Sequence, residues 1–335
     1  MAGETKSLVI SQTPYRISLG GGGTDLPFYS RERGGTLISA TINQYLTVSV
    51  AKRPLDNKIL TQTTTVQFAD RLDDLKDNFI REALRYFDIS QAVQIASFST
   101  LPTNIGLGTS STFMVGLVAG LSKLIGKRLS TMEIGSIAHY IEREILELSG
   151  GIQDQYIASL GGVQILKINT SGEVIAQNLM IKAQNLRELE KKLLLIYTGI
   201  DRDSTNIIKS QKSDIKKTLE VYDQIKELGH QSVDLLKNAD IDGLGRVMNE
   251  HWEIKKTLSG KMSNSIIDKL YIKLKECGSP GGKIIGAGGG GFFIMAVPGD
   301  VKAYLSKIKG LGYRVLNWHF EFKGAHILES FGNEK

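Results

Sequence analysis

A glycine-rich segment followed at once by an apolar run is the clearest place in this sequence for chemistry. Residues 106–111 read Gly-Leu-Gly-Thr-Ser-Ser, and the apolar residues 113–121 follow, which predicts a buried helix. Glycines let the backbone turn tightly and approach a ligand, while the three hydroxyls would lie where a helix start leaves N–H groups unpaired. Such a helix start can bind a polyphosphate, and hydroxyls can bind Mg²⁺. The alternative is an ordinary capped helix.

A second segment, residues 14–25, places an arginine and a carboxylate on either side of four consecutive glycines. It follows the first predicted strand and is expected to form a loop. Arg16 could stabilise charge on a transferring phosphoryl group, and Asp25 could accept hydrogen bonds from the hydroxyls of a sugar. The glycines cost folding entropy, which favours a close approach to a ligand or to another backbone. Asp25 could instead cap the turn before Pro27.

A third glycine-rich segment, residues 281–294, ends in a predicted strand. It reads Gly-Gly-Lys-Ile-Ile-Gly-Ala-Gly-Gly-Gly-Gly-Phe-Phe-Ile. A flexible linker would have a similar glycine content, but here apolar residues flank the glycines on both sides. We therefore expect a tight backbone nest that faces a ligand or a domain partner.

Three acidic residues lie between these segments, and local pattern alone gives none of them a role. Glu142 and Glu144 fall on opposite edges of the apolar stripe of a predicted helix over 131–148, so periodicity does not choose between them. A solvated flank is the default interpretation for both. Asp154 follows a Gly-Gly break and could be a simple helix cap.

Size and composition narrow the class of protein. The 335 residues are 41% hydrophobic, enough for one large or two ordinary domains, and no apolar run is long enough to cross a bilayer. One cysteine, Cys277, and no signal-peptide pattern favour a reducing cytoplasm. Five scattered histidines disfavour a zinc site. The net charge of +6 is well mixed, which disfavours nucleic-acid binding and suits small anionic substrates.

Periodicity and turn residues predict an α+β protein of two domains, with the function in the cleft between them. In the first half, strands are expected over 8–12, 36–42, 46–51 and 93–98, helices over 79–87 and 131–148, and a hairpin over 161–168 and 174–179. In the second half, helices are expected over 204–237, 240–258, 263–276 and 300–311, and strands over 193–197, 291–297, 314–318 and 326–329. The polar run 182–192 is the predicted domain boundary.

Taken together, the three glycine segments resemble the motifs of the GHMP kinases, the superfamily of galactokinase, homoserine kinase and mevalonate kinase, in the family's order. Residues 150–156, Gly-Gly-Ile-Gln-Asp-Gln-Tyr, resemble the segment with the family's catalytic aspartate. The resemblance covers most of the chain. It implies an ATP-binding N-terminal domain over 1–180, like domain 2 of ribosomal protein S5. It also implies a C-terminal domain over 181–335, a ferredoxin-like α/β sandwich.

The resemblance also implies roles for individual residues. Asp154 matches the catalytic aspartate, and Arg16 matches a basic residue near the transferring phosphoryl group. Mg²⁺ would be held by Ser110 and Glu142, because the family's glutamate precedes its aspartate by the twelve residues found here. The ATP-binding residues would be Gly106, Leu107, Gly108, Thr109, Ser110 and Ser111. The substrate-binding residues would be Gly22, Gly23, Asp25, Gly288 and Gly289.

Within the superfamily the chain most resembles the D-glycero-D-manno-heptose 7-phosphate kinases. The shared segments are 13–27, 150–156 and 317–322, and His251-Trp252 with Lys255. These enzymes use ATP to phosphorylate the anomeric C1 hydroxyl and form the 1,7-bisphosphate. Residues 21–23 are all glycine where galactokinases have Gly-Glu-His, which argues against galactose and suggests a roomier sugar site. Residues 109–111 read Thr-Ser-Ser where relatives often have Ser-Ser-Ala, and this change keeps the hydroxyls.

Other functions stay open at this point. The chain could be another sugar 1-kinase acting on an unphosphorylated sugar, an isoprenoid-pathway kinase, or a catalytically dead sugar sensor. Candidates for binding the sugar phosphate are Lys255, Lys283, Arg31 and Arg53, although each reads first as an ordinary surface or structural base. The expected partners are ATP and a sugar phosphate, with no nucleic acid and no membrane. The sequence leaves the oligomeric state open, with a homodimer among the options.

Overall fold

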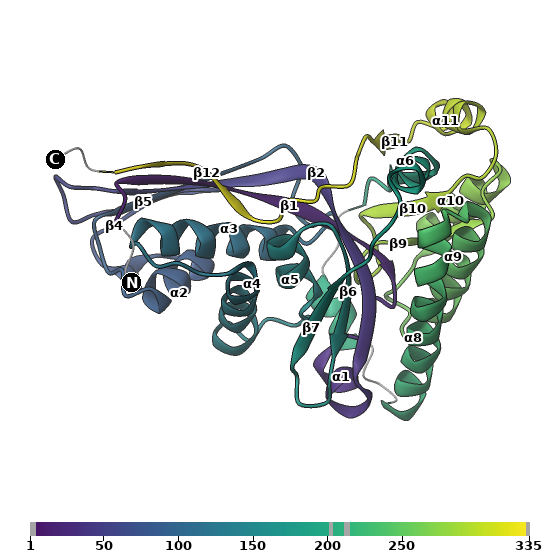
Figure 1. Ribbon diagram of the computed structural model, residues 1–335, viewed down its shortest axis with the longest axis horizontal. Coiled ribbons are helices and arrows are strands. Elements are labelled where there is room, and N and C mark those ends of the chain that lie inside the picture. The colour runs from purple at the N-terminus through teal and green to yellow at the C-terminus, as the bar shows by residue number, and fades with distance from the viewer. Residues whose placement is uncertain (1–4, 201–203, 211–214, 333–335) are drawn as a thin grey trace.

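The first of two structural units is built on a large mixed sheet (Figure 1). The computed structural model describes residues 5–200, 204–210 and 215–332. In this part of the chain the sheet has the order β12-β1-β2-β5-β3-β4, and β6 joins it by pairing with both β2 and β7. Its strands are β1 (Leu8–Gly20), β2 (Gly35–Lys52), β3 (Ile59–Gln62), β4 (Val66–Ala69), β5 (Val93–Ser99), β6 (Val163–Ile168), β7 (Val174–Asn178) and β12 (His326–Phe331).

Helices α2, α3 and α4 cover one face of this sheet, and α3 is the central one (Figure 1). A Cβ atom on Gly116 would lie 2.9 Å from Thr13 Oγ1, and one on Gly120 would lie 3.2 Å from Val50. The two glycines therefore let α3 approach the sheet closely, which fixes the position of its first turn. The helices of this unit are α1 (Pro27–Arg33), α2 (Asn78–Tyr86), α3 (Thr109–Leu124), α4 (Thr131–Tyr140) and α5 (Gln153–Leu160), with a 3-10 turn η1 (Leu72–Asp74) and a π-helical turn η2 (Ile141–Ile145).

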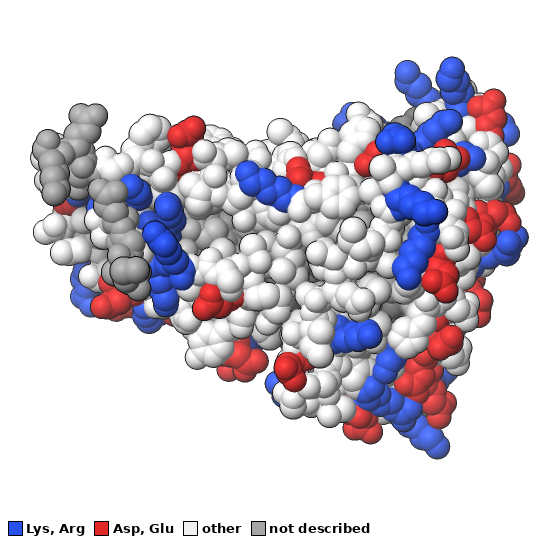
Figure 2. Space-filling model, in the orientation of Figure 1, with Lys and Arg blue, Asp and Glu red and all other residues white. Residues whose placement is uncertain are grey.

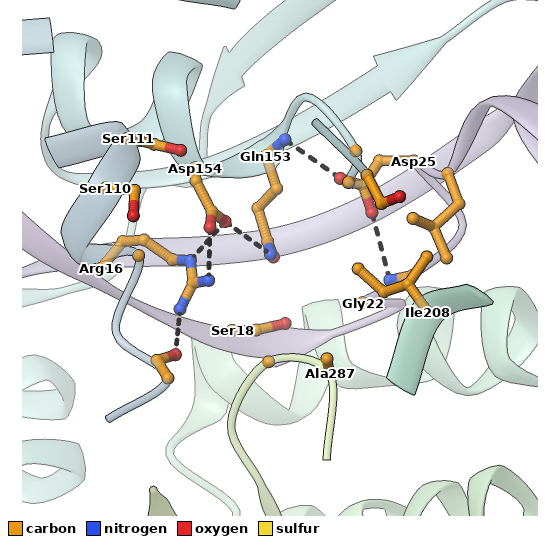
Figure 3. Close-up of a pocket in the computed structure, with 18 of the residues that line it drawn as sticks. Arg16, Ser18, Gly22, Asp25, Ser110, Ser111, Gln153, Asp154, Ile208 and Ala287 are labelled. Carbon is orange, nitrogen blue, oxygen red and sulfur yellow. Dashed lines mark hydrogen bonds and ion pairs between the residues drawn. The ribbon is translucent and has the colours of Figure 1, made fainter. Parts of the chain in front are cut away.

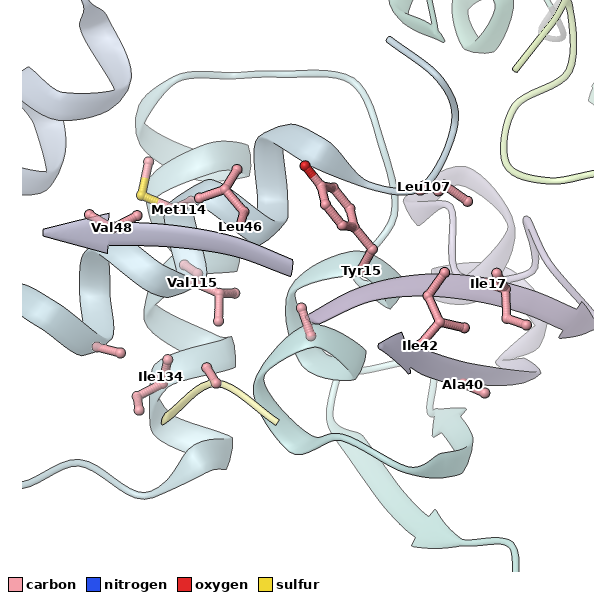
Figure 4. Close-up of a cluster of buried hydrophobic side chains, with 14 of the residues drawn as sticks. Tyr15, Ile17, Ala40, Ile42, Leu46, Val48, Leu107, Met114, Val115 and Ile134 are labelled. Carbon is pink, nitrogen blue, oxygen red and sulfur yellow. The ribbon is translucent and has the colours of Figure 1, made fainter. Parts of the chain in front are cut away.

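The first-unit core lies where α3 meets β1 and β2. Met114 and Val115 of α3 pack there with Leu46 and Val48 of β2 (Figure 4). The predicted strands 36–42 and 46–51 are one continuous strand, β2. Its first half pairs with β6 and its second half with β5, so a single long strand spans both parts of the sheet.

The prediction that residues 14–25 form a loop is wrong for their first part. Strand β1 continues to Gly20 and pairs with β2, with register shifts after Pro14 and after Ser18. Tyr15, Ile17 and Leu19 are fully buried, so the alternation of a strand turns the side chains between them to the opposite face. Arg16 therefore stands on a strand of the central sheet, which is a stiffer support than a loop.

The second unit is a smaller antiparallel sheet of order β11-β8-β10-β9 with helices packed around it. Its strands are β8 (Leu193–Tyr197), β9 (Gly281–Ile284), β10 (Phe292–Ala296) and β11 (Arg314–Leu316), and its helices are α6 (Ala183–Lys192), α7 (Ser204–Ser210), α8 (Ile215–Asn238), α9 (Ile241–Lys256), α10 (Ser265–Glu276) and α11 (Val301–Gly310). The polar run 182–192 is thus mostly a helix. The single helix expected over 204–237 is divided between α7 and α8, and residues 211–214 lie outside the described residues.

The chain returns to the first unit at its end. Strand β12 pairs antiparallel with β1, with Leu8 opposite Phe331. A domain division at 180/181 stays a prediction, and it would leave this last strand on the sheet of the other domain.

The surface and the helices bear on two further expectations. On the face shown in Figure 2, basic and acidic side chains are interspersed, and the centre of that face is mostly uncharged. This pattern fits the mixed charges of the sequence. Among the described residues, no helix combines the length and the apolar character needed to span a bilayer.

Candidate active site

A cavity of about 680 Å³ is lined by residues of both units. We call one side the N-terminal wall, whose polar members are Arg16, Ser18, Asp25, Thr109, Ser110, Ser111, Glu142, Arg143, Gln153 and Asp154. We call the other side the C-terminal wall, which comprises Ile208, Tyr222, Lys255, Lys283, Gly286 and Ala287. The cavity thus brings together predicted site residues from three distant segments of the sequence.

A bidentate ion pair lies at the centre of the N-terminal wall (Figure 3). Arg16 donates from Nε and Nη2 to the two carboxylate oxygens of Asp154, at 2.7 and 2.8 Å, and from Nη1 to the Gly106 carbonyl at 2.8 Å. Arg16 is 3% exposed, whereas Asp154 is 23% exposed at the start of α5. The arginine therefore orients a carboxylate that is still open to the cavity.

The first turn of α3 touches this ion pair. Gly108 begins the helix with φ +83°, a conformation that favours glycine. A Cβ atom at this position would lie 3.2 Å from Asp154 Oδ2 and 3.5 Å from Arg16 Cζ. Helix starts present unpaired N–H groups to anions, so a phosphate bound here would lie beside the Asp154 carboxylate. Leu107, which was also predicted to bind ATP, is fully buried in the core.

Glu142 is buried in the N-terminal wall, on the π-helical turn η2. Its Oε2 accepts hydrogen bonds from Ser111 Oγ at 2.7 Å and from Gln155 Nε2, and its Oε1 has no hydrogen-bond partner among the described residues. Burial raises the pKa of Glu142 above its usual value. Glu144, two residues on, is exposed. Helical periodicity could not separate these two acids, because the π-helical turn changes the spacing of side chains at this point.

The residues around Glu142 fit a magnesium ion. An unpartnered buried carboxylate oxygen and nearby hydroxyls are hard oxygen ligands, and Mg²⁺ at nucleotide sites takes one or two carboxylates plus phosphate oxygens. The hydroxyl bonded to Glu142 belongs to Ser111. Ser110, the predicted magnesium ligand, is exposed and lines the cavity. No group of three or more potential metal-binding side chains occurs in the described part of the chain, in keeping with a site completed by a ligand.

Asp25 lies at the other end of the N-terminal wall, after the glycine turn. Its Oδ2 accepts from the Gln153 amide at 3.0 Å and its Oδ1 from the Gly23 amide at 3.2 Å. Burial, the largest cause, raises its pKa. The Gln153 bond ties Asp25 to the residue next to Asp154. The sequence gave no signal for this use of Gln153.

The glycines of the other two motifs have different roles. Gly22 and Gly23 line the cavity, but Gly288 and Gly289 do not, and the Gly289 amide donates to the Met262 carbonyl at 2.8 Å. A Cβ atom on Gly291 would overlap the Ile105 carbonyl, next to the phosphate loop. The third glycine segment thus packs against a domain partner, and only Gly286 and Ala287 reach the cavity. A substrate-binding role for Gly288 and Gly289 stays a prediction.

Two bases of the C-terminal wall differ from the first expectation for them. Lys255 and Lys283 are 6% and 2% exposed, and both line the cavity. The other two candidates for binding a sugar phosphate do not line it: Arg31 is exposed, and Arg53 pairs with Asp56. Tyr222 of α8 also reaches the cavity, close to Gly23. Nothing local in the sequence distinguishes this tyrosine from other apolar positions of its helix.

Comparison with known proteins gives consistent relatives. The family models for the GHMP kinases N terminal domain and the GHMP kinases C terminal match residues 78–162 and 232–313. The chain is 31% identical to D-glycero-alpha-D-manno-heptose 7-phosphate kinase of Campylobacter jejuni, over 94% of this chain and 97% of that one. It is 24% identical to the bifunctional fucokinase/GDP-fucose pyrophosphorylase of Arabidopsis thaliana, over 92% of this chain and 32% of that protein. The crystal structure of a D-glycero-D-manno-heptose 1-phosphate kinase from Bacteroides thetaiotaomicron superposes with a TM-score of 0.80 at 25% identity, covering 96% of this chain and 99% of that one.

Proposed function

This chain belongs to the GHMP kinases, and on that premise we propose that it transfers the γ-phosphoryl group of ATP to the anomeric C1 hydroxyl of D-glycero-D-manno-heptose 7-phosphate. The product would be the 1,7-bisphosphate. The chain is a phosphotransferase with an alcohol group as acceptor, and it has the two-domain fold of the family, with mixed helices and sheets. The choice of sugar rests on the two heptose phosphate kinases among its relatives.

The observation that carries the proposal is the contact between the phosphate loop and the Arg16–Asp154 pair. Gly108 begins α3 within van der Waals reach of the Asp154 carboxylate. A terminal phosphoryl group at the helix start would therefore lie next to a carboxylate that can hold an attacking hydroxyl. Phosphoryl transfer needs mainly positioning and neutralisation of charge, and this arrangement supplies both.

The chain's own residues divide the work between nucleotide and sugar. The N–H groups and hydroxyls of Thr109, Ser110 and Ser111 would bind the triphosphate. Mg²⁺ held near Glu142 would neutralise charge on the phosphate oxygens. Asp25 would accept a hydrogen bond from a sugar hydroxyl, since each of its oxygens has a lone pair beyond those used by the Gly23 and Gln153 amides.

In the transfer step, a bond forms between the C1 oxygen and the γ-phosphorus while the bond from that phosphorus to the bridging oxygen breaks. ADP leaves with the bridging oxygen, and the proton of the C1 hydroxyl passes to Asp154. Arg16 donates to both oxygens of Asp154 and keeps the carboxylate ionised and aimed at the hydroxyl. As charge leaves the carboxylate, the guanidinium can stabilise the phosphoryl oxygens.

A second candidate acceptor is an unphosphorylated sugar, because the similarity to a fucokinase covers 92% of this chain. The two acceptors are separated by measuring ADP release with Mg-ATP and heptose 7-phosphate, mannose 6-phosphate, galactose, fucose or mevalonate. We expect turnover of heptose 7-phosphate alone, with the new phosphate at C1. Turnover of galactose or fucose in its place would overturn the substrate and keep the reaction type. Mevalonate turnover would favour the isoprenoid-pathway alternative, and ATP binding without any turnover would favour a sugar sensor.

Two further expectations stay predictions beside this one. A cytoplasmic location would suit the free thiol of Cys277, which is half-buried. A homodimer would be detected by sedimentation of the purified chain.

A further inference from the structure

The C-terminal wall holds buried bases that the proposed transfer step does not use. Lys255 lies in the last turn of α9 and Lys283 in the middle of β9, and both face the cavity. His251 lies one helical turn before Lys255 and is also buried. These residues come from two separate elements of the second unit, so the fold itself gathers them on this wall.

Lys283 is the most unusual member of this group. It is 2% exposed, and its Nζ has no hydrogen bond or ion pair to any residue in the described ranges. Lys255 Nζ donates to the Gly286 carbonyl at 2.8 Å, which holds that ammonium at the rim of the third glycine segment. The charges that act most strongly on Lys283 are those of Lys255 and Arg16, and both are positive.

The nearest acids have their hydrogen bonds on the opposite wall. Asp154 bonds Arg16, Glu142 bonds Ser111, and Asp25 bonds the Gln153 amide. A buried ammonium without a counter-charge costs several kcal/mol, and an apolar side chain of similar volume is usually more stable in such a place. In agreement, burial together with the two neighbouring cations lowers the pKa of Lys283 well below its usual value. A bound anion would offset this cost.

We propose that Lys283 and Lys255 form a second phosphate subsite, on the C-terminal wall, which binds a phosphate group of an incoming substrate. The first site, at the start of α3, binds phosphate through N–H groups and hydroxyls, whereas this one binds through ammonium groups that no described carboxylate neutralises at Lys283. A phosphate dianion suits a position that faces two ammonium groups and the Arg16 guanidinium. The choice of a sugar phosphate as one source rests on the proposed function, but the subsite itself does not.

Two sources could supply this phosphate: the group that the sugar already carries, or the terminal phosphate of ATP. Equilibrium binding by calorimetry distinguishes them, with Mg-ATP, heptose 7-phosphate and the phosphate-free heptose as separate probes. The proteins are the natural chain, Lys283→Met, Lys283→Arg and the control Lys302→Met, which removes an exposed lysine of the same unit. Lys283→Met should weaken one phosphate ligand roughly 10- to 100-fold. It should leave phosphate-free heptose unchanged, and Lys283→Arg should retain most of the affinity.

The ligand that is weakened identifies the source of the phosphate. Equal binding of both phosphate ligands by Lys283→Met and the natural chain would overturn the proposal, as would an equal loss for the phosphate-free sugar. A purely structural lysine predicts a lower unfolding temperature for Lys283→Met, whereas the subsite predicts an equal or higher one. If Lys283→Met does not fold, Lys255→Met takes its place in the same measurements. If the natural chain binds no heptose 7-phosphate, the proposed substrate fails, and inorganic pyrophosphate as the probe still decides whether the subsite exists.

Discussion

The two walls of the cavity treat charge in opposite ways. On the N-terminal wall each acid is held by neighbours from distant segments: Asp154 by Arg16, Glu142 by Ser111, and Asp25 by the Gln153 amide. On the C-terminal wall the buried Lys283 faces other cations and has no carboxylate partner within the described residues. One wall is electrostatically organised before any ligand arrives, and the other is completed by a ligand.

This difference teaches how a transferase can combine a fixed chemical centre with a ligand-dependent one. Groups that orient the reacting atoms work best when they are already held in place. Groups that recognise a charged substrate gain from facing it with few competing partners, because their desolvation is offset when it binds. The walls also come from different units, so each task has its own structural support.

The largest test of this contrast is Asp154→Asn. The amide is a poor proton acceptor, so we expect the turnover number to fall ~10³-fold while Mg-ATP binding changes little. Turnover is measured by ADP release, and nucleotide binding by calorimetry. The matched control is Asp56→Asn, which removes the carboxylate of another bidentate arginine pair, with Arg53, away from the cavity. Full activity in Asp154→Asn would break the assignment of the N-terminal wall as the chemical centre.

Next in size is Glu142→Gln, compared with Glu144→Gln. Loss of the buried carboxylate should raise the Mg²⁺ concentration needed for half-maximal activity roughly 100-fold, because the amide has no charge to offer a cation. Glu144 is exposed, and its variant should behave like the natural chain. The measurement is a magnesium titration of ADP release at saturating nucleotide. Equal shifts in the two variants would contradict a metal site at Glu142.

Gly151→Ala tests how strictly the N-terminal wall is organised. A Cβ atom on Gly151 would overlap the Asp25 carboxylate, which must then move away from the Gln153 amide. We expect KM for the sugar to rise about tenfold, with KM for ATP nearly unchanged. Gly299→Ala serves as the control, since a Cβ atom there would meet nothing within 4 Å. An unchanged sugar KM would show that Asp25 need not be held in its present position.

The smallest expected effect concerns His139, a half-buried residue three positions before Glu142. Burial and the charges of Arg143 and Arg31 lower its pKa from 6.5 to about 4. The unfolded chain therefore binds this proton more tightly. The stabilisation is complete above about pH 6.5 and is lost as the pH falls toward 4. The loss should be about 1 to 2 kcal/mol, and His139→Gln should remove it in denaturant unfolding at several pH values. The same slope in both proteins would assign the acid sensitivity to other groups.

Local patterns in the sequence predicted much of the secondary structure. The helix expected over 79–87 and the hairpin over 161–168 and 174–179 agree with α2, β6 and β7 to within two residues. Each of these elements shows its periodicity in its own residues. The two-domain fold and the kinase family followed from three motifs taken together, because their joint order is far more specific than any single glycine cluster.

The details of the site depended on contacts that no local pattern carries. The sequence could not show that Arg16 stands on a strand, since the glycines that end β1 hide its last residues. Nor could it separate Glu142 from Glu144, because the π-helical turn is set by packing around it. The burial of Lys255 and Lys283 was missed for the same reason. Whether a lysine is covered depends on the elements packed above it, and these come from elsewhere in the chain.

Because β12 is the last strand and pairs with β1, the second unit is inserted within the first. A ribosome would therefore expose the edge of β1 for the whole time needed to synthesise the residues between them. An unpaired edge strand is a template for association with other chains. The sheet that carries Arg16 is closed on this side only when the final residues emerge, so a shortened chain would lack this protection even with every cavity residue present.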